Sequence, residues 1–240
     1  MIGLFTDVHN VLRMVLVMVI AYLLGSLNIA IIVTKIFTGG KDIRTMGSGN
    51  AGFTNVMRSV GTAAGILTFI GDFLKCVAAI IVGGLLCKNM TGSANVVELS
   101  GYGKYLAGMC CFLGHIYPVY FKFKGGKGIV TMAALSAVIN FPVFAVSFLS
   151  FAITFIITKI VSISSIIGAS VLAAATFLIT YFYNYKALGA VSFEYVVTVS
   201  ILTLAISATT IIKHRENIKR LLKGEEKKLS LKKKIKKEDQ

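Results

Sequence analysis

Charged residues are scarce in this chain: they make up 15% of its 240 residues, and only 10 side chains are acidic. Soluble globular domains carry about 25% charged residues, so the composition argues against a soluble enzyme. Hydrophobic residues make up 56% and the mean hydropathy is +0.81, which argues equally against a disordered chain. The formal net charge is nevertheless +15. A hydrophobic yet basic chain is typical of an integral membrane protein whose charges lie outside the hydrocarbon.

Metal-binding and disulfide motifs are also missing. The chain has 4 cysteines, no CxxC pair, and every cysteine lies within an apolar run. The sequence therefore predicts neither a zinc site nor a disulfide framework. We expect small buried hydrophobic side chains instead at Cys76, Cys87, Cys110 and Cys111.

The basic residues concentrate at the C-terminal end, where residues 213–240 hold 12 of the 25 basic and 5 of the 10 acidic side chains. This segment has no aromatic residue on which a nucleic-acid base could stack, so nucleic-acid binding is the weaker interpretation. Attraction to anionic membrane lipid is favoured. The stretch from Lys227 to Lys237 has low complexity, and we expect it to be disordered or lipid-associated.

Seven apolar runs are candidates for transmembrane helices, which need about 20 mostly apolar residues. They lie near Val11–Phe37, Thr62–Cys87, Tyr105–Phe121, Gly128–Asn140, Phe141–Thr158, Ser162–Tyr183 and Phe193–Ile212. The fourth run is short, and one bent helix around Pro142 could replace the fourth and fifth. We therefore predict an all-α integral membrane protein with seven transmembrane helices, six being the alternative.

The loops between these runs differ in charge. With seven spans, one set of loops contains Lys41, Arg44, Arg58, Lys122, Lys124, Lys127 and Lys159 and ends in the basic tail. The opposite set is poorer in cations. The positive-inside rule then places the N-terminus outside and the C-terminus in the cytoplasm, which six spans would contradict. We expect one polytopic membrane domain at residues 1–212 and a cytoplasmic basic tail at 213–240 that includes His214 and Asn217.

The first of three polar segments on the predicted cytoplasmic side runs from Asp42 to Arg58. Its glycines let backbone amides turn inward with little steric cost, and neighbouring side chains add hydrogen-bond donors and positive charge. Such a segment is typical of an anion-binding nest, while a plain glycine-rich connection between two spans is the alternative. The residues concerned are Gly47, Ser48, Gly49, Asn50, Thr54 and Arg58.

The second segment contains Gly125-Gly126-Lys127-Gly128, which would let a lysine approach a phosphate beside exposed amides. It is not a nucleotide P-loop, because neither Ser nor Thr follows Lys127 and the upstream glycine spacing differs. His115, shortly before it, is either a ligand-binding group or a histidine hydrogen-bonded at a helix end.

The third segment is split between the start of the sixth run and the end of the seventh. Ser162 and Ser165 begin one helix and could simply cap it. His214 and Asn217 share a helix face at i and i+3, and could simply be solvated at the membrane boundary.

Two charged residues, Asp72 and Lys75, lie inside the second span. Ionisable groups at membrane depth normally face a polar interior. At i and i+3 the two can pair with each other, and a helical turn that lines a polar cavity is the alternative.

Taken together, these segments resemble the bacterial acyl-phosphate:glycerol-3-phosphate acyltransferases of the PlsY type. The order and spacing of the motifs agree from about Gly25 to Glu225. The motif residues are Gly25-Ser26 and Asp42–Arg58, then Gly114–Thr131, then Ser162, Ser165, His214, Asn217 and Arg220–Gly224. Two positions depart from the family pattern, since Phe53 stands where a small residue is usual and Val130 where alanine is usual.

The resemblance implies transfer of a fatty acyl group from acyl phosphate to the sn-1 hydroxyl of glycerol 3-phosphate, giving lysophosphatidic acid and phosphate at the bacterial plasma membrane. It implies neither a metal nor a nucleotide cofactor. The implied catalytic residues are Ser48, Thr54, Lys127, Ser165, His214 and Asn217. The implied substrate- and phosphate-binding residues are Gly47, Gly49, Asn50, Arg58, Gly125, Gly126 and Ser162.

The chemistry expected is direct attack by the glycerol hydroxyl, because acyl phosphate is already activated. The proton acceptor is either His214 or a substrate phosphate. A histidine oriented by a carboxylate in a His-x4-Asp pattern is absent, because Met14, Tyr120 and Lys219 stand five residues beyond the three histidines. A membrane transporter or channel for a phosphorylated metabolite is the alternative function, and a membrane scaffold with a charged tail is a third.

Overall fold

The computed structural model describes residues 7–91 and 94–229, and all regular secondary structure in these residues is helical. The helices are α2 (Val8–Ser26), α3 (Ile29–Thr38), α4 (Phe53–Ser59), α5 (Thr62–Cys87), α6 (Val96–Ile116), α7 (Ile129–Ile139), α8 (Phe141–Thr158), α9 (Val161–Leu178), α10 (Phe193–Lys213) and α11 (Arg215–Leu222). Short 3₁₀ turns lie at Ile43–Thr45 and Val119–Phe121, and a π-helix at Ile179–Ala187 continues α9.

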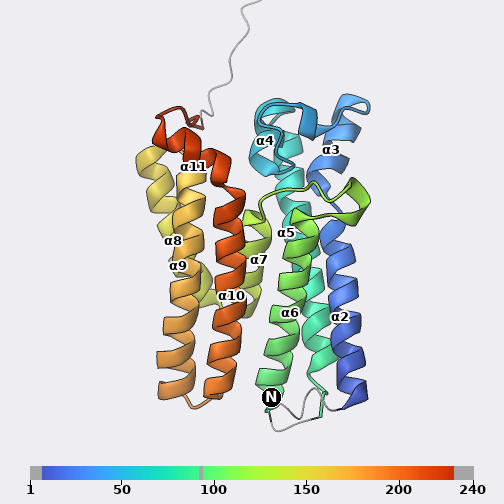
Figure 1. Ribbon diagram of the computed structural model, residues 1–240, viewed down its shortest axis with the longest axis vertical. Coiled ribbons are helices and arrows are strands. Elements are labelled where there is room, and N and C mark those ends of the chain that lie inside the picture. The colour runs from blue at the N-terminus through green and yellow to red at the C-terminus, as the bar shows by residue number, and fades with distance from the viewer. Residues whose placement is uncertain (1–6, 92–93, 230–240) are drawn as a thin grey trace, which may run out of the picture.

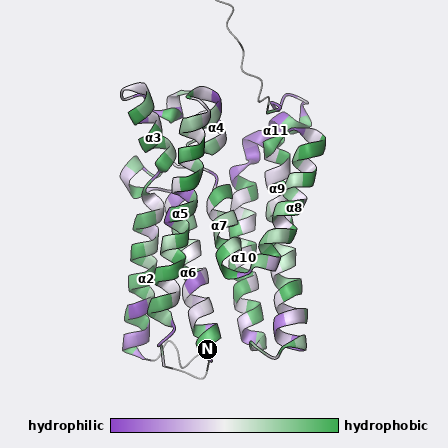
Figure 2. Ribbon diagram, turned by 180° about the vertical axis from the view of Figure 1, so that it is seen from behind, coloured by the Kyte–Doolittle hydropathy of each residue, from purple (hydrophilic) through white to green (hydrophobic). Residues whose placement is uncertain are grey.

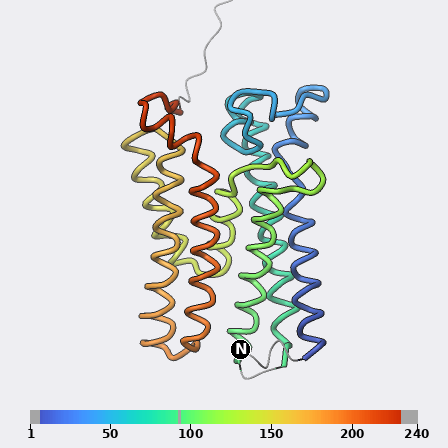
Figure 3. The backbone as a smooth tube through the Cα atoms, viewed as in Figure 1, coloured from blue at the N-terminus to red at the C-terminus, as the bar shows by residue number. Residues whose placement is uncertain are grey.

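The long helices form an upright bundle in two groups. Helices α2, α5 and α6 lie on one side, α8, α9 and α10 on the other, and α7 lies between them (Figures 1 and 2). The smooth tube in Figure 3 shows that α2 begins at one end of the bundle and that α4 and α11 lie at the other. Hydrophobic residues predominate along the long helices (Figure 2), and many large hydrophobic side chains are exposed, such as Leu12, Ile157 and Leu204, as expected where lipid is the solvent.

The first predicted span is two helices rather than one. Helix α2 ends at Ser26, and the fully buried Asn28 starts α3 by accepting a hydrogen bond from the Ile31 amide (3.1 Å). The carbonyl freed at Leu27 accepts a hydrogen bond from Lys75 Nζ (2.7 Å). A side-chain amide and an ammonium thus satisfy the broken backbone inside the bundle, as the hydrocarbon requires.

The third predicted span, Tyr105–Phe121, was wrong at its start, because α6 begins nine residues earlier, at Val96. Asn95 caps this helix, and Glu98, only 3% exposed, accepts a hydrogen bond from the backbone amide of Ser192 at the start of α10. Asn95 and Glu98 therefore join α6 to the segment before α10, in the other helix group.

Helices α7 and α8 are two separate helices and not one helix bent at Pro142. Asn140 between them has an extended backbone (φ −148°, ψ 90°) and caps α8. Helix α7 has 11 residues, about 16 Å, which is shorter than the roughly 30 Å of hydrocarbon. The turn after it accordingly lies part of the way along the bundle (Figure 1). Five helical stretches in the described residues have the length and apolar composition of a membrane span.

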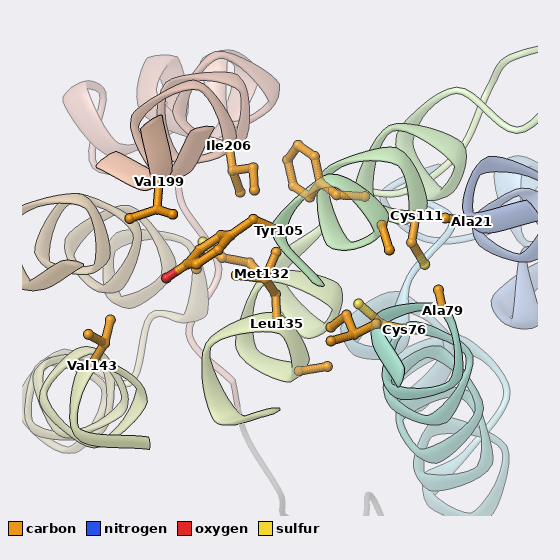
Figure 4. Packing of buried hydrophobic residues seen from close by; sticks show 14 of the residues in the cluster. Ala21, Cys76, Ala79, Tyr105, Cys111, Met132, Leu135, Val143, Val199 and Ile206 are labelled. Atoms are coloured by element: carbon orange, nitrogen blue, oxygen red, sulfur yellow. The ribbon is translucent and has the colours of Figure 1, made fainter. Parts of the chain in front are cut away.

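The core joins both helix groups through small and branched side chains. Cys76 of α5 and Cys111 of α6 belong to the same cluster as Val199 and Ile206 of α10. In Figure 4, Tyr105, Met132 and Leu135 lie between these two pairs. Backbones approach closely where a β-carbon would not fit: one at Gly83 would lie 2.4 Å from the Gly103 carbonyl oxygen. Small residues at such contacts are the usual basis of helix packing in membranes. All four cysteines are free, and only Cys110 is not fully buried.

Candidate active site

A cavity of about 860 Å³ opens at the end of the bundle where α4 and α11 lie. It brings together residues of all three polar segments, although these are far apart in the sequence. Every predicted site residue except Gly126 lines it: Gly47, Ser48, Gly49, Asn50, Thr54, Arg58, Gly125, Lys127, Ser162, Ser165, His214 and Asn217.

The buried side chain of Asn55 shapes the first polar segment. Its amide nitrogen donates hydrogen bonds to the carbonyls of Met46 (2.9 Å) and Asn50 (3.0 Å), and its oxygen accepts one from the Ser48 amide (3.0 Å). Gly47 and Gly49 have positive φ angles of 57° and 71°, which glycine adopts at no steric cost. The expected turn is therefore present.

Two amides of this segment are paired within it. The Ser48 amide donates to Asn55, and the Gly49 amide donates to the Met46 carbonyl (2.9 Å). Ser48, Thr54 and Arg58 of this segment line the cavity and bring two hydroxyls and a guanidinium to it.

The two arginines of the segment have different roles. Arg44 binds Asp42 (Nη2 to Oδ2, 2.7 Å) and donates to the Phe121 carbonyl (2.8 Å), which ties the first segment to the loop after α6. The hydrogen bond from Arg44 holds the pKa of Asp42 below its ordinary value. Arg58 is exposed and donates a long hydrogen bond (3.4 Å) to the carbonyl of Lys227. Arg44 is thus structural, whereas Arg58 remains available to an anion.

Gly125 and Gly126 bring the Lys127 loop against the end of α6. Their amides donate to the carbonyls of Ile116 and His115 (both 3.1 Å). A β-carbon at Gly126 would lie 2.3 Å from His115 Nε2. The two glycines therefore permit close packing, and their amides are not free phosphate donors. Gly126 packs behind the cavity instead of lining it.

Lys127 begins a chain of polar contacts that crosses to the other helix group. Its Nζ donates to the side-chain oxygen of Asn217, and the Asn217 nitrogen donates to Glu226 Oε1 (2.6 Å). Burial lowers the pKa of Lys127 to about 8, although the negative charge of Glu226 acts in the opposite direction. The lysine is thus mostly charged at neutral pH yet able to lose its proton under mildly alkaline conditions.

Glu226 is a site residue that the sequence did not reveal. It accepts hydrogen bonds from Ser162 (2.9 Å) and Asn217 and pairs with Arg220 (2.6 Å). Although burial raises its pKa, these hydrogen bonds hold the pKa of Glu226 below its ordinary value. In sequence it is one acidic residue among the lysines of the predicted tail. Residues of the predicted tail, among them His214, Asn217 and Glu226, line the cavity together with residues of the predicted membrane domain. Residues 230–240 of that tail lie outside the described part.

His214 lies at the junction of α10 and α11, not within one continuous helix, yet it lines the cavity together with Asn217. Its Nδ1 lies 2.8 Å from the Thr210 carbonyl, which can only accept, so Nδ1 carries the hydrogen and Nε2 is the basic nitrogen. Burial and the nearby Lys127 lower its pKa to about 4. At neutral pH His214 is a neutral hydrogen-bond acceptor. Ser165, by contrast, donates its hydroxyl to its own helix, at the Val161 carbonyl (2.8 Å).

Asp72 and Lys75 form the predicted pair, with Oδ1 and Nζ 2.7 Å apart. His115 joins them, its Nδ1 3.4 Å from Asp72 Oδ1 and 3.2 Å from Lys75 Nζ. Asp72 and His115 also line the cavity. Both sequence interpretations of this pair therefore hold: it is a buried ion pair, and its helical turn borders the cavity.

No group of three His, Cys, Asp or Glu side chains is placed to hold a metal ion anywhere in residues 7–91 and 94–229. The polar side chains that line the cavity include five cations, several hydroxyls and two histidines, and the cations are Arg58, Lys127, Lys213, Arg220 and Lys227.

Comparison with known proteins identifies the family. The glycerol-3-phosphate acyltransferase family model matches residues 15–224. A glycerol-3-phosphate acyltransferase of Clostridioides difficile (strain 630) is 37% identical over 220 residues, covering 91% of this chain and 97% of that protein. One from Thermoanaerobacter sp. (strain X514) is 39% identical over 223 residues, covering 92% and 98%.

A solved structure agrees in fold. The glycerol 3-phosphate form of PlsY (YgiH), an integral membrane glycerol 3-phosphate acyltransferase, superimposes with a TM-score of 0.72 at 30% identity, covering 90% of this chain and 96% of that one. Its lysophosphatidic acid form gives a TM-score of 0.71, also at 30% identity, covering 90% and 95%. The chain therefore belongs to the glycerol-3-phosphate acyltransferase family and is an integral membrane acyltransferase.

Proposed function

We propose that the protein transfers a fatty acyl group from acyl phosphate to the sn-1 hydroxyl of glycerol 3-phosphate, giving lysophosphatidic acid and inorganic phosphate. The observation that carries this proposal is the cavity itself. One end has cations, hydroxyls and a neutral histidine, and the other has phenylalanine side chains from α5 and α8. A phosphate and an acyl chain can be held there with the reacting carbonyl at the boundary.

The charge balance of the cavity supports a donor that carries its own phosphate. Each carboxylate on its wall has a cation partner in the pairs Asp72–Lys75, Glu216–Lys219 and Glu226–Arg220. Further cations on the wall are Arg58, Lys127, Lys213 and Lys227. This surplus matches two substrates that each bring a phosphate, because charge-assisted hydrogen bonds to phosphate are strong.

Direct attack by the glycerol hydroxyl needs no covalent acyl-enzyme. Lys127 and the Ser48 segment hold the acyl phosphate and stabilise the charge that develops on the carbonyl and the departing phosphate. His214 and Asn217 position the acceptor. With a pKa of about 4, His214 is a weak base that suits accepting the hydroxyl's hydrogen bond. The substrate phosphate, with a pKa of about 6, is the stronger candidate for taking the proton.

The same proposal places the protein in the bacterial plasma membrane with seven spans and the active site facing the cytoplasm. The cation-rich loops and α11 lie at the cavity end of the bundle, and α2 begins at the opposite end (Figure 3). The positive-inside rule makes the cavity end cytoplasmic and the N-terminus external. Helices α7 and α8, which turn back partway along the bundle, count as the fourth and fifth spans.

The proposal is tested with purified protein in detergent or bilayers. Palmitoyl phosphate should release phosphate and form lysophosphatidic acid only when glycerol 3-phosphate is present. Folded protein that makes no product under these conditions would contradict the function. Equal activity with acyl-CoA or acyl carrier protein would contradict the proposal that acyl phosphate is the donor. A carrier for a phosphorylated metabolite would instead move glycerol 3-phosphate across vesicles without consuming palmitoyl phosphate.

A further inference from the structure

A second cavity, of about 430 Å³, lies between the segment before α4 and the loop that joins α6 to α7. Its volume is within the range of pockets that hold small ligands, about 300–1,000 Å³. Gly49 and Gly125 line both this cavity and the larger cavity described above, so the two cavities share a wall made of these two loops. We call the second cavity the loop pocket, and its charged lining residues are Asp42, Arg44, Lys122 and Lys124.

Two of the three cations that line the loop pocket have no acidic partner among the residues that the structure describes. The guanidinium of Arg44 binds Asp42 through Nη2 (2.7 Å) and donates through Nη1 to the Phe121 carbonyl (2.8 Å). Lys122 and Lys124 are exposed, and neither forms a salt bridge within residues 7–91 and 94–229. The loop pocket therefore has a surplus of two positive charges, which suits a ligand with a phosphate group.

The backbone that carries these two lysines is strained. Lys122 and Phe123 both have a φ of 57°, in the left-handed region that is costly for a residue with a β-carbon. Arg44 holds the turn by donating to the carbonyls on either side of it, at Phe121 (2.8 Å) and Lys124 (3.4 Å). Such strain persists only where surrounding contacts fix it, and it is frequent in segments that bind a ligand.

The same loop lies at the outer edge of the bundle. Tyr22 of α2 donates its hydroxyl to the Tyr117 carbonyl at the end of α6 (2.8 Å), and the loop extends beside α2 and α3 (Figures 1 and 3). Tyr120 is 53% exposed and Phe123 is 57% exposed. Exposed aromatic side chains are typical of the membrane–water interface. Lysines there cover apolar surface with their stems while their ammonium groups reach the headgroups.

The neighbouring apolar residues favour a lipid over a free phosphate ion as the occupant. A free ion would use only the two ammonium groups, and the exposed rings of Tyr120 and Phe123 would then have no function in binding. Leu23 and Leu27, at the end of α2, are also exposed and extend the apolar surface along the bundle. A lipid can place its phosphate on the lysines and its acyl chains on this surface.

We propose that the loop pocket binds the phosphate group of an anionic membrane phospholipid through Lys122 and Lys124. The lipid chains then lie along the outer face of the bundle, beside Tyr120 and Phe123. Basic groups at a membrane surface attract anionic lipid, and the fixed turn gives this attraction a defined position. The site is separate from the larger cavity, and its ligand is not consumed.

A lipid bound in this pocket acts on the reaction through the chain that follows Lys124. Gly125 and Gly126 come next, and their amides hold the loop against the end of α6. Lys127 follows directly. An anion on Lys124 therefore restricts the backbone three residues before the cation proposed to hold substrate phosphate. We expect faster turnover in a bilayer that contains anionic lipid, and this step rests on the role proposed for Lys127 above.

A fluorescence measurement without any acyl donor tests the binding site. The chain has no tryptophan, so Tyr120→Trp supplies a single fluorophore two residues before Lys122. The variant is reconstituted in phosphatidylcholine bilayers in which one-fifth of the lipid has brominated, quenching chains. We expect brominated phosphatidylglycerol to occupy the site about fivefold more strongly than brominated phosphatidylcholine. Equal quenching by the two lipids would overturn the proposal.

Matched charge variants locate this preference. Lys122→Gln combined with Lys124→Gln, in the Tyr120→Trp background, should abolish the preference for phosphatidylglycerol. Lys35→Gln combined with Lys41→Gln removes the same charge from two other exposed lysines, which do not line the loop pocket, and should leave the preference intact. An equal loss in both pairs would show diffuse attraction to the membrane and overturn the site.

A competition experiment distinguishes lipid from free phosphate. Millimolar inorganic phosphate is added at constant ionic strength to bilayers that contain brominated phosphatidylglycerol. We expect the quenching to stay unchanged, because the lipid is also held by its chains. Loss of quenching would assign the loop pocket to a free phosphate compound and overturn the lipid as occupant.

Turnover tests the link to Lys127. We expect kcat for acyl transfer to glycerol 3-phosphate to be about threefold higher with phosphatidylglycerol than in pure phosphatidylcholine. The stimulation should disappear in the Lys122→Gln, Lys124→Gln variant and persist in the Lys35→Gln, Lys41→Gln variant. Preferential binding without stimulation would overturn the link. Absence of product from palmitoyl phosphate in every bilayer would count against the proposed function alone, because the quenching measurement needs no donor.

Discussion

The Lys127 ammonium donates a hydrogen bond to the side-chain oxygen of Asn217, 90 residues later in the chain. This contact joins the loop after α6 to α11, and so joins the two helix groups across the mouth of the cavity. Asn217 in turn donates to Glu226. The neutral side-chain amide of Asn217 therefore orients Lys127, the cation proposed to hold phosphate. The carboxylate of Glu226 binds the nitrogen of the same amide, so it does not cancel the charge of Lys127 through a direct contact.

Lys127 should give the reaction an alkaline limit. Its pKa of about 8 is below the ordinary lysine value, so the ammonium is present below pH 8 and is lost as pH rises through it. We expect kcat/KM for glycerol 3-phosphate to fall above pH 8. Lys127→Arg should move this fall to higher pH while keeping activity within about tenfold, because the guanidinium stays charged. Lys127→Met should lose ~100-fold or more at all pH values. An unchanged alkaline limit in Lys127→Arg would assign it to another group.

His214 should set the position of the acceptor and not the acidic limit of the reaction. A pKa of about 4 leaves it neutral throughout pH 5–8, so its protonation does not shape the profile there. We expect His214→Ala and His214→Gln to lower kcat by ~10–100-fold without moving the acidic limb. A limb that disappears in both variants would show that His214, and not the substrate phosphate, is the proton acceptor.

The sequence predicted the fold class, most helix positions and a set of site residues of which all but Gly126 line the cavity, because these depend on local patterns. Apolar runs mark helices, and glycines and cations mark the polar segments. The break at Asn28 was missed because one asparagine hardly changes the hydropathy of a long apolar run. The true start of α6 was missed because Glu98 looks solvated until its partner, the Ser192 amide, is known.

Glu226 shows the same limit of prediction from sequence within the candidate active site. Its partner Ser162 lies 64 residues earlier in the chain, and no local pattern links a serine at the start of α9 to a glutamate in a lysine-rich tail. The resemblance to known motifs also ended at residue 225. Side chains whose role is to hold other side chains can be recognised only when the helices are placed in space.

Glu226 should matter for stability as well as activity. Glu226→Gln keeps the size of the side chain but removes the charge that Arg220 and Asn217 contact. We expect the free energy of unfolding to fall by about 1–3 kcal/mol and kcat to fall through misplacement of Asn217. The lowered pKa of Glu226 means that its contribution is present above the ordinary value of 4.5 and is lost as pH falls below it. Thermal unfolding in detergent measures the loss of stability and its pH dependence, and a steady-state assay measures kcat.

A double-mutant cycle with Arg220→Gln isolates the ion pair. If Glu226 acts through Arg220, the double variant should be little less stable than either single variant. Asn217→Ala is the second comparison, because it removes the side chain that contacts Lys127 and leaves the Glu226–Arg220 ion pair in place. Fully additive losses for Glu226→Gln and Arg220→Gln would show that the contact contributes nothing measurable, as is common for exposed pairs.

Gly126 should be intolerant of a single methyl group, although it does not line the cavity. A β-carbon there would lie 2.3 Å from His115 Nε2 and 2.6 Å from the Ala51 carbonyl oxygen. His115 is held by Asp72 and Lys75 and cannot retreat, so the loop must move and Lys127 must move with it. We expect Gly126→Ala to lower kcat/KM for glycerol 3-phosphate by about tenfold or more. Gly189→Ala, at the opposite end of the bundle with open space around it, is the control: it should cost only about 1 kcal/mol of stability for its positive φ and leave kinetics unchanged. Normal kinetics in Gly126→Ala would mean that the position of Lys127 does not depend on the packing of this loop against His115.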